Sequence, residues 1–295
     1  MIMPDELAVK KLPALRAPHV HMKNIDQVAR IINKIIQDGS EKLQIVTDFD
    51  LTLTKQHVNG KQVLSSFGIF GKCKQLSSTF TEESRRLYHK YRPIEIDPNI
   101  PLESKVKAME EWTALARDML SGFEFDAKEL DEVAEKYGTA LRDGTKHLFE
   151  RLNIVNVPIL VFSAGLGDVV QAVLRHNRVL WDNVKIVSNF LKYKDGKLDG
   201  FVSDRVIHVF NKNEHTVEED YFNILKGRCN VVVMGDSIGD AAMADGVKDI
   251  ENILKIGFLY DHAEEHLPTY MDLFDIVLVD DQTMNVPFEI LKPIL

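Results

Sequence analysis

The stretch from Gln44 to Thr54 limits most strongly what this chain can fold into. Apolar and β-branched residues there run directly into Asp48-Phe49-Asp50. Such a pattern is typical of a buried parallel strand that carries acidic side chains to the carboxyl edge of a sheet, where open α/β sheets bind their ligands. If the strand continued through Asp50, the two carboxylates would share one face and repel each other. The pair therefore predicts a bound cation, although an acidic turn after a strand has the same sequence.

Length and charge narrow the class of protein. The chain has 295 residues, enough for one large domain or two of ordinary size, and its 45% hydrophobic and 27% charged residues are typical of a soluble globular protein. The formal net charge is −9, and there is no long basic block. We therefore expect no nucleic-acid polymer as a partner, whereas a single nucleotide is compatible with this charge because one lysine or a metal ion can bind one phosphate.

The cysteines and the N-terminal residues predict the compartment. Only Cys73 and Cys229 occur, without the spacing of metal ligands, which favours a reducing environment without disulfides. Charged residues and prolines interrupt the apolar stretches among the first thirty residues, and no segment approaches the roughly 20 apolar residues of a membrane span. We therefore expect a cytoplasmic protein that does not bind a membrane, and we expect a monomer.

The spacing of apolar residues divides the chain into an arm, a core and an insertion. Residues 1–23 contain three prolines and are expected to form a weakly ordered arm. Residues 24–60 and 138–295 alternate short apolar runs with helical patterns, which predicts an α/β core domain with a parallel, Rossmann-like sheet. Residues 61–137 lack strand-like runs and are predicted to be a helical cap domain, inserted after the first catalytic strand and placed to close over the sheet edge.

Local signals add detail to this division. One helix of the insertion is expected to end at Tyr91, because Arg92-Pro93 follows. A stripe of methionines around Trp112 is interpreted as the core of the cap rather than as a surface that binds a base. Asp195-Gly196 between short flanks predicts a hairpin.

Three of the predicted strands end in residues whose chemistry is complementary. Asp48 and Asp50 follow the first, Ser163-Ala164-Gly165 ends the second, Gly235-Asp236-Ser237-Ile238-Gly239-Asp240 follows a later one, and Lys212 stands on a loop. One parallel sheet would bring these segments around a single pocket at its carboxyl edge. In this order the segments resemble the four motifs of the haloacid dehalogenase superfamily of phosphohydrolases. The resemblance implies the fold of that superfamily and a phosphate ester as substrate.

The residue types fit the magnesium-dependent mechanism that this resemblance implies. A carboxylate attacks a phosphate readily only where a cation offsets their like charges, and hard cations choose oxygen ligands. Asp48, the backbone carbonyl of Asp50 and Asp236 are the expected Mg²⁺ ligands. Asp48 is the expected nucleophile, which forms an aspartyl-phosphate. The carboxylate of Asp50 is expected to protonate the leaving group and later to deprotonate water.

The remaining motif residues are expected to bind phosphate or to support the metal site. Four groups would hold the phosphate oxygens: the Ser163 hydroxyl, the amides of Ala164 and Gly165, and the Lys212 ammonium. Asp240 would position Lys212 or a metal-bound water rather than ligate the metal itself. Thr52 would brace the loop that carries the nucleophile.

Several of these residues have a simpler interpretation when each is taken alone. Ser163 and Asp240 also fit ordinary helix caps, and Lys212 is one of many lysines. His57 and His208 are interpreted as structural, because chemistry at a hard metal ion does not need imidazole.

A closer resemblance covers nearly all of residues 24–295. The segments that carry it are Lys42–Asp50, Ile94–Pro98, Phe162–Asp168, Val187–Phe190, Ile207–Lys212 and Met243–Val247. They are similar to segments of the cytosolic 5'-nucleotidase III family, which includes pyrimidine-specific and 7-methylguanosine phosphate-specific nucleotidases. The resemblance implies a Mg²⁺-dependent hydrolase of nucleoside 5'-monophosphates such as CMP, UMP or 7-methyl-GMP. It also implies the capacity to pass the phosphoryl group to another nucleoside.

The same resemblance implies how the base is bound. Glu95 would accept a hydrogen bond from the base, and Phe67 would stack on it, a contact worth about 1–3 kcal/mol. A surface carboxylate and a plug of the cap interface are the simpler interpretations of these two residues. Thr113 and Ala116 stand where relatives commonly have an aromatic residue and a serine. The preferred base is therefore left open.

Two other functions fit parts of the pattern. A phosphatase of the same superfamily that acts on a small metabolite such as phosphoserine would share the motifs but would ignore the base. A catalytically silent scaffold would keep the fold for protein binding. Such a scaffold has no need for Asp48, Asp50, Lys212 and Asp236 together, so the presence of all four argues against it.

Overall fold

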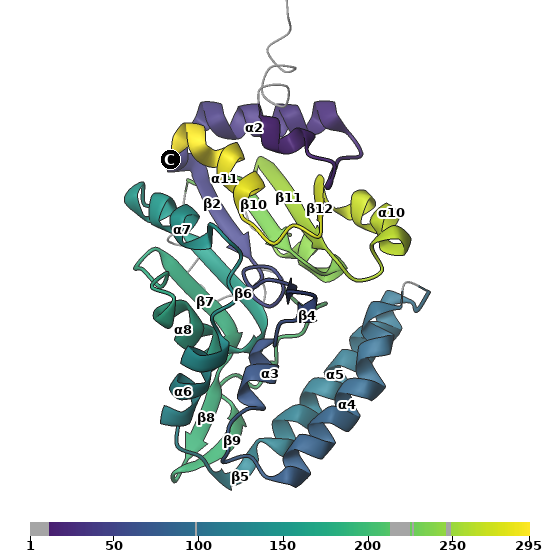
Figure 1. Ribbon diagram of the computed structural model, residues 1–295, viewed down its shortest axis with the longest axis vertical. Helices are drawn as coiled ribbons and strands as arrows, with labels where there is room; N and C mark the ends of the chain where they lie inside the picture. Colours follow the sequence, from purple (N-terminus) through teal and green to yellow (C-terminus); the bar gives the residue numbers. More distant parts are fainter. Residues whose placement is uncertain (1–11, 98, 213–224, 226, 246–248) are drawn as a thin grey trace, which may run out of the picture.

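A seven-stranded sheet forms the centre of the fold (Figure 1). The structure is a computed structural model that describes residues 12–97, 99–212, 225, 227–245 and 249–295. In the order in which they pair, the strands are β1 (Val20–His21), β12 (Ile276–Val279), β11 (Asn252–Leu259), β10 (Asn230–Gly235), β2 (Leu43–Thr47), β6 (Ile159–Leu166) and β7 (Val184–Asn189). Of these strands, β1 runs antiparallel to β12 and the others run parallel to their neighbours. The predicted parallel α/β core is confirmed, with β2 inside the sheet between β10 and β6.

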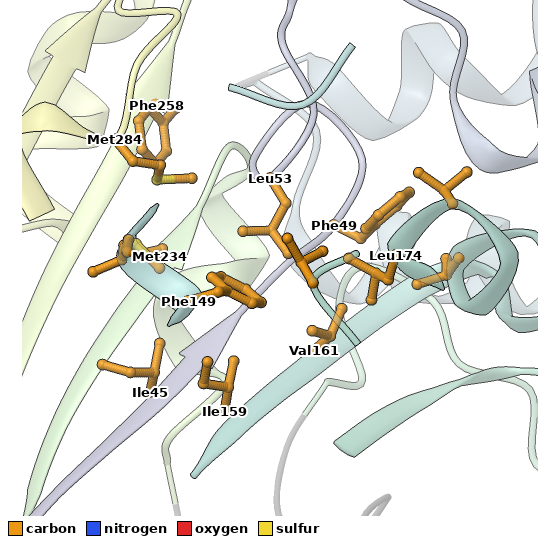
Figure 2. Close-up of a cluster of buried hydrophobic side chains, with 14 of the residues drawn as sticks. Ile45, Phe49, Leu53, Phe149, Ile159, Val161, Leu174, Met234, Phe258 and Met284 are labelled. Atoms are coloured by element: carbon orange, nitrogen blue, oxygen red, sulfur yellow. The ribbon is translucent and has the colours of Figure 1, made fainter. Parts of the chain in front are cut away.

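The strands are apolar because both faces of the sheet are covered. The described helices of the core are α2 (Ile25–Asp38), α7 (Thr145–Ile154), α8 (Gly167–His176), α10 (Ala263–Leu273) and α11 (Asn285–Leu291). Ile45 of β2 belongs to the buried cluster that includes side chains of α2, α7, α8 and α11, whereas its neighbour Val46 packs with Leu160 and Val231 on the other face. Figure 2 shows part of the first cluster. The alternation anchors β2 from both sides.

Two long helices stand beside the sheet as a pair (Figure 1). They are α4 (Ser78–Ile96) and α5 (Leu102–Met119). Leu87, Tyr91 and Met109 are buried between them, and the ring of Tyr91 stacks on Trp112 with a centroid separation of 5.7 Å and an interplanar angle of 12°. The stripe around Trp112 is therefore core of the helix pair, as predicted.

Helix α4 continues through Pro93, so the prediction that it ends at Tyr91 is wrong. Pro93 has no N–H to donate to the carbonyl four residues before it. It stands in the last turn, so the helix loses only this one bond and ends soon afterwards. Lys105 Nζ of α5 donates a hydrogen bond to the Glu95 carbonyl at 3.0 Å and so holds this turn. The extra turn places Arg92 and Glu95 on the same helix.

A small second sheet connects the end of the insertion to the core. Its strands are β5 (Ser121–Glu124), β9 (Lys197–Phe201) and β8 (Leu191–Lys194), paired in that order. The neighbouring helix α6 (Lys128–Tyr137) packs against α8. The predicted hairpin is confirmed: Asp195 and Gly196 have φ angles of 51° and 79°, the left-handed values that a two-residue type I′ turn requires. Residues 121–137, in the predicted cap region, thus pair with β9 and pack against α8.

The described part of the predicted N-terminal arm is joined to the core. The 3₁₀-helix η1 (Pro13–Arg16) buries Leu15, and β1 pairs with β12 at the edge of the sheet. Residues 1–11 lie outside the described residues. None of the helices that the structure describes combines the length and the apolar surface needed to cross a membrane.

Candidate active site

Asp48 stands directly after β2, at the carboxyl edge of the sheet. Its amide donates to the Met234 carbonyl of β10 at 2.9 Å, so the backbone follows the sheet up to this residue. Phe49 then turns into the core, where it is fully buried (Figure 2). The Phe49 carbonyl accepts a hydrogen bond from the Leu53 amide at 3.0 Å, which closes a tight loop. Asp48 and Asp50 therefore stand on either side of the buried Phe49 in a loop, and they do not share the face of a continuing strand.

Lys212 holds one side of the Asp48 carboxylate. Its Nζ donates to Asp48 Oδ1 and, at 2.8 Å, to Asp240 Oδ1, and all three side chains are buried. Burial alone would lower the pKa of Lys212, but the carboxylates of Asp240 and Asp48 together raise it, so the lysine stays charged. Asp48 Oδ2 is buried without a hydrogen-bond partner among the described residues. A buried oxygen of this kind is rare in folded proteins and indicates a ligand.

Three carboxylates converge here. One oxygen each of Asp48, Asp236 and Asp240 lies within 4.8 Å of the others, and Thr52 Oγ1 donates to Asp236 Oδ1 at 3.3 Å. Burial, and then the neighbouring carboxylates of Asp48 and Asp240, raise the pKa of Asp236 well above its ordinary value. Burial also raises the pKa of Asp48, although the charge of Lys212 opposes this. A divalent cation would offset the repulsion, and an all-oxygen donor set suits Mg²⁺, so these residues fit the predicted metal.

Asp240 is already bound on both sides. Its Oδ1 accepts from Lys212, and its Oδ2 accepts from the amide and the hydroxyl of Ser237, each at 3.0 Å. A Cβ on Gly235 would lie 2.2 Å from the Cβ of Asp240, so the close approach of these two residues requires glycine. Both oxygens of Asp240 thus accept hydrogen bonds from the protein, and its role in positioning Lys212 stays a prediction.

The Asp50 carboxylate is bound by Ser66, the first residue of α3 (Ser66–Phe70). The Ser66 amide donates to Asp50 Oδ1 at 2.7 Å, and its hydroxyl donates to Oδ2 at 2.6 Å. Burial raises the pKa of Asp50, although both bonds from Ser66 lower it. Ser66 was not predicted from the sequence, because a serine at the start of a short helix carries no signal of its own.

The end of β6 reaches the same place. Ser163 Oγ accepts a hydrogen bond from the Gly165 amide at 3.0 Å. A Cβ on Gly165 would lie 2.0 Å from Ser66 Oγ and 2.7 Å from Asp50 Oδ2, so only glycine lets this strand end approach Asp50. Ala164, between them, is partly exposed. The second predicted motif is therefore brought next to the first.

A cavity of about 190 Å³ lies beside Asp236, with walls from both α4 and the core. Glu95, on its α4 side, accepts a hydrogen bond from Arg92 Nη1 at 2.7 Å. Burial would lower the pKa of Arg92, but the carboxylates of Glu95 and Asp236 raise it. Arg92 thus connects the residue predicted to recognise the base with the carboxylate cluster. This role of Arg92 was not predicted from the sequence, because Arg92 was expected to lie beyond the end of its helix.

The other residues considered for base binding do not line this cavity. Phe67, on α3, has 39% of its surface exposed. Thr113 Oγ1 donates to the Met109 carbonyl within α5 at 2.9 Å, and Ala116 is half-buried on the same helix. The structure therefore does not assemble Phe67 and Glu95 into one closed pocket.

Comparison with known proteins identifies the family. Residues 51–295 match the family model of pyrimidine 5'-nucleotidase (UMPH-1). A 7-methylguanosine phosphate-specific 5'-nucleotidase from Drosophila melanogaster is 51% identical over 97% of this chain and 90% of its own length. The crystal structure of cytosolic 5'-nucleotidase IIIB bound to cytidine has a TM-score of 0.93 and 51% identity, covering 98% of this chain and 97% of that one.

A more distant structure shares only the fold. It is a probable phosphoserine phosphatase from Vibrio cholerae, with a TM-score of 0.52 and 16% identity over 88% of this chain and 68% of that chain. The haloacid dehalogenase fold and the 5'-nucleotidase enzyme class predicted from the motifs are confirmed. The chain belongs to the pyrimidine 5'-nucleotidase family.

Proposed function

We propose that this protein hydrolyses nucleoside 5'-monophosphates of pyrimidines or 7-methylguanosine to the nucleoside and phosphate. The observation that carries the proposal is the asymmetry of Asp48: Lys212 holds Oδ1, whereas Oδ2 is buried without a partner in the carboxylate cluster. Oδ2, which makes no hydrogen bond to a described residue, is therefore free for nucleophilic attack. The choice of bases is supported by the names of the relatives and by the cytidine bound to the related crystal structure.

Asp48, Asp236 and the backbone carbonyl of Asp50 would hold Mg²⁺. When bound, the ion supplies positive charge that offsets the repulsion between the nucleophile and the phosphate oxygens. The convergence of the Asp48, Asp236 and Asp240 carboxylates and the raised pKa of Asp236 support a cation at this position.

Asp48 and Asp50 have different roles in the reaction. Asp48 forms a bond to phosphorus, the bond from phosphorus to the 5'-oxygen breaks, and Asp50 gives its proton to that oxygen. Water then attacks the aspartyl-phosphate, Asp50 takes a proton from it, and phosphate leaves. The pKa of Asp50, raised by burial, supports its role as the acid. A nucleoside hydroxyl in place of water would accept the phosphoryl group, which makes the enzyme a phosphotransferase.

Other groups bind the two ends of the substrate. Those for the phosphate oxygens are the Ser163 hydroxyl, the amides of Ala164 and Gly165, and the Lys212 ammonium. Glu95 recognises the base, whereas stacking by Phe67, which does not line the cavity with Glu95, stays a prediction. Burial of Glu95 to 10% side-chain exposure and its hydrogen bond from Arg92 support an oriented carboxylate, since an ordinary surface glutamate has neither. The description of the related nucleotidase as cytosolic supports a cytoplasmic location.

A substrate panel tests this function. CMP, UMP, 7-methyl-GMP, AMP and phosphoserine are offered to the wild type, Asp48→Asn and Glu95→Gln, with Mg²⁺ and with EDTA. We expect Mg²⁺-dependent hydrolysis of the pyrimidine or 7-methylguanosine nucleotides, and loss of turnover by about 10³-fold or more in folded Asp48→Asn. Equal hydrolysis of all five esters, unchanged by Glu95→Gln, would refute the nucleotide function and favour a general phosphatase. Full turnover in Asp48→Asn would refute the mechanism.

A further inference from the structure

Arg142 is buried next to the nucleophile loop, and the mechanism above does not use it. Its exposure is 1%. Nε donates to the Thr52 carbonyl at 2.6 Å, Nη2 donates to the Leu51 carbonyl at 2.5 Å, and Nη1 donates to the Asp281 carbonyl. The guanidinium carbon lies 3.9 Å from the centroid of the Phe258 ring. One side chain thus binds two consecutive residues of the loop and ties them to the far end of the chain.

The acceptors of these hydrogen bonds are neutral, yet Arg142 keeps its charge. Burial lowers its pKa to about 10, against the opposing effect of the carboxylates of Asp236 and Asp281, and this value is still well above neutral pH. A buried cation is costly for a fold unless its hydrogens are all satisfied. The guanidinium therefore binds the loop with charge-assisted hydrogen bonds, which are stronger than those between neutral groups.

The loop that Arg142 holds is strained. Leu51 has a φ of 63°, a left-handed conformation that is unfavourable by about 1–2 kcal/mol for a residue with a side chain. The Leu51 amide donates to Thr54 Oγ1 at 2.7 Å, while its carbonyl accepts from Arg142. These two bonds hold Leu51 on either side. Because Leu51 directly follows Asp50, its backbone angle determines how the loop leaves the peptide that links the two residues, whereas Ser66 holds the Asp50 carboxylate.

We propose that Arg142 is a positioning residue: by holding the carbonyls of Leu51 and Thr52, it keeps Asp50 in the orientation that protonates the leaving 5'-oxygen. The inference rests on the proposed function. Without the guanidinium, Leu51 relaxes towards an ordinary backbone angle, and the backbone of Asp50 shifts relative to Ser66, which holds its carboxylate. A displacement of about 1 Å in a catalytic group can reduce the rate about 10²-fold.

The chain contains a matched control at the opposite end of the same strand. Arg228 Nη1 donates to the carbonyls of Ser40 and Leu43, at 2.8 and 2.6 Å, and its Nη2 donates to the Asn156 carbonyl at 3.0 Å. Arg228 therefore also binds backbone carbonyls at three positions, but at the amino end of β2, away from Asp48. A purely structural contribution of such an arginine is measured by Arg228→Lys.

The experiment compares two leaving groups. The 5'-oxygen of CMP or of the best nucleotide substrate needs a proton from Asp50, whereas the nitrophenolate of 4-nitrophenyl phosphate leaves without one. The value of kcat/KM is measured for both esters in the wild type, Arg142→Lys, Arg228→Lys and Asp50→Asn, together with urea denaturation of each. We expect Arg142→Lys to lose about 10- to 100-fold on the nucleotide and less than about threefold on 4-nitrophenyl phosphate. Asp50→Asn should show the same selectivity, and Arg228→Lys should show none.

Equal losses on both esters in Arg142→Lys, or the same selectivity in Arg228→Lys, would overturn the proposal. If Arg142→Lys does not fold, Thr54→Val removes the other hydrogen bond that holds Leu51, the one from its amide to Thr54 Oγ1. That variant should show the same selective loss to a smaller degree, and an equal effect on both esters would again overturn the proposal. A wild type that cleaves 4-nitrophenyl phosphate but no nucleotide would overturn the proposed function instead, and this role of Arg142 with it.

Discussion

The ammonium of Lys212 lies 2.8 Å from Asp240 Oδ1 while it also contacts Asp48. The amide and the hydroxyl of Ser237 donate to the other oxygen of Asp240 and fix the orientation of this carboxylate. Lys212 therefore binds a carboxylate with a fixed position. One cation thus serves two buried anions, and the site depends on it for both charge and geometry.

Replacing Lys212 by methionine should damage stability and activity together. Asp48 and Asp240 would remain buried without their counter-charge, which is expected to lower the free energy of unfolding by about 3–5 kcal/mol. Loss of the cation that faces the phosphate should lower kcat by about 10²–10³-fold. Urea denaturation and steady-state kinetics measure the two effects, with Lys61→Met, at an exposed lysine of β4 (Lys61–Gln62), as the control. An unchanged free energy of unfolding would contradict the expectation that the ion pairs with Lys212 stabilise the two buried carboxylates.

Magnesium should stabilise the fold through Asp236. In the absence of Mg²⁺, Asp236→Asn should raise the midpoint of thermal unfolding, because it removes one of the converging charges. Mg²⁺ should raise the midpoint of the wild type, because at 100 times its Kd it adds about 2.7 kcal/mol to the free energy of unfolding. The midpoint of the variant should not change. EDTA should abolish turnover of the wild type. Asp272→Asn, at an exposed carboxylate paired with Lys23, is the control; an equal Mg²⁺ response in both variants would contradict the metal site.

Arg92→Gln should weaken binding of the nucleotide without slowing the chemistry. The variant loses the charged partner that orients Glu95, so KM for the preferred nucleotide should rise about fivefold or more, with kcat within about twofold of the wild type. Ribose 5-phosphate, which lacks a base, should be turned over with unchanged KM. Arg86→Gln is the matched control, since Arg86 pairs with Glu83 at the same spacing on the exposed side of α4. The same KM in both variants would remove Arg92 from base recognition.

Asp168 offers a test of pH dependence away from the cavity. Its Oδ2 accepts from the Leu191 amide at 2.8 Å, and burial raises its pKa above the ordinary value. A raised pKa in the folded state means that its contribution to stability is complete at low pH and is lost as the pH rises through that pKa. The free energy of unfolding of the wild type minus that of Asp168→Asn should therefore decrease as the pH rises above about 4, the ordinary pKa of an aspartate. Urea denaturation at several pH values measures it, and an increase over this range would contradict the prediction.

The sequence alone determined the sheet and the types of group at its carboxyl edge. Apolar runs, bounded by turns and separated by helical patterns, specify buried parallel strands locally. The residues directly after each run then lie at the carboxyl edge, because parallel strands all end on the same side of the sheet. For this reason the strands that lead to Asp48, Ser163 and Asp236 could be predicted to end at one edge, although they are far apart in the chain.

The packing of distant elements determines which common residues complete the site. Ser66, Arg92 and Arg142 act through contacts with Asp50, Glu95 and the Leu51–Thr52 carbonyls, and nothing in their local sequence marks them. Arg142 lies 90 residues from Thr52 in the chain. Periodicity reports which face of an element is buried, whereas the partner of a buried polar group is determined by how distant elements pack. Helix α4 illustrates the same limit, because a contact from α5 supports the turn that Pro93 was expected to end.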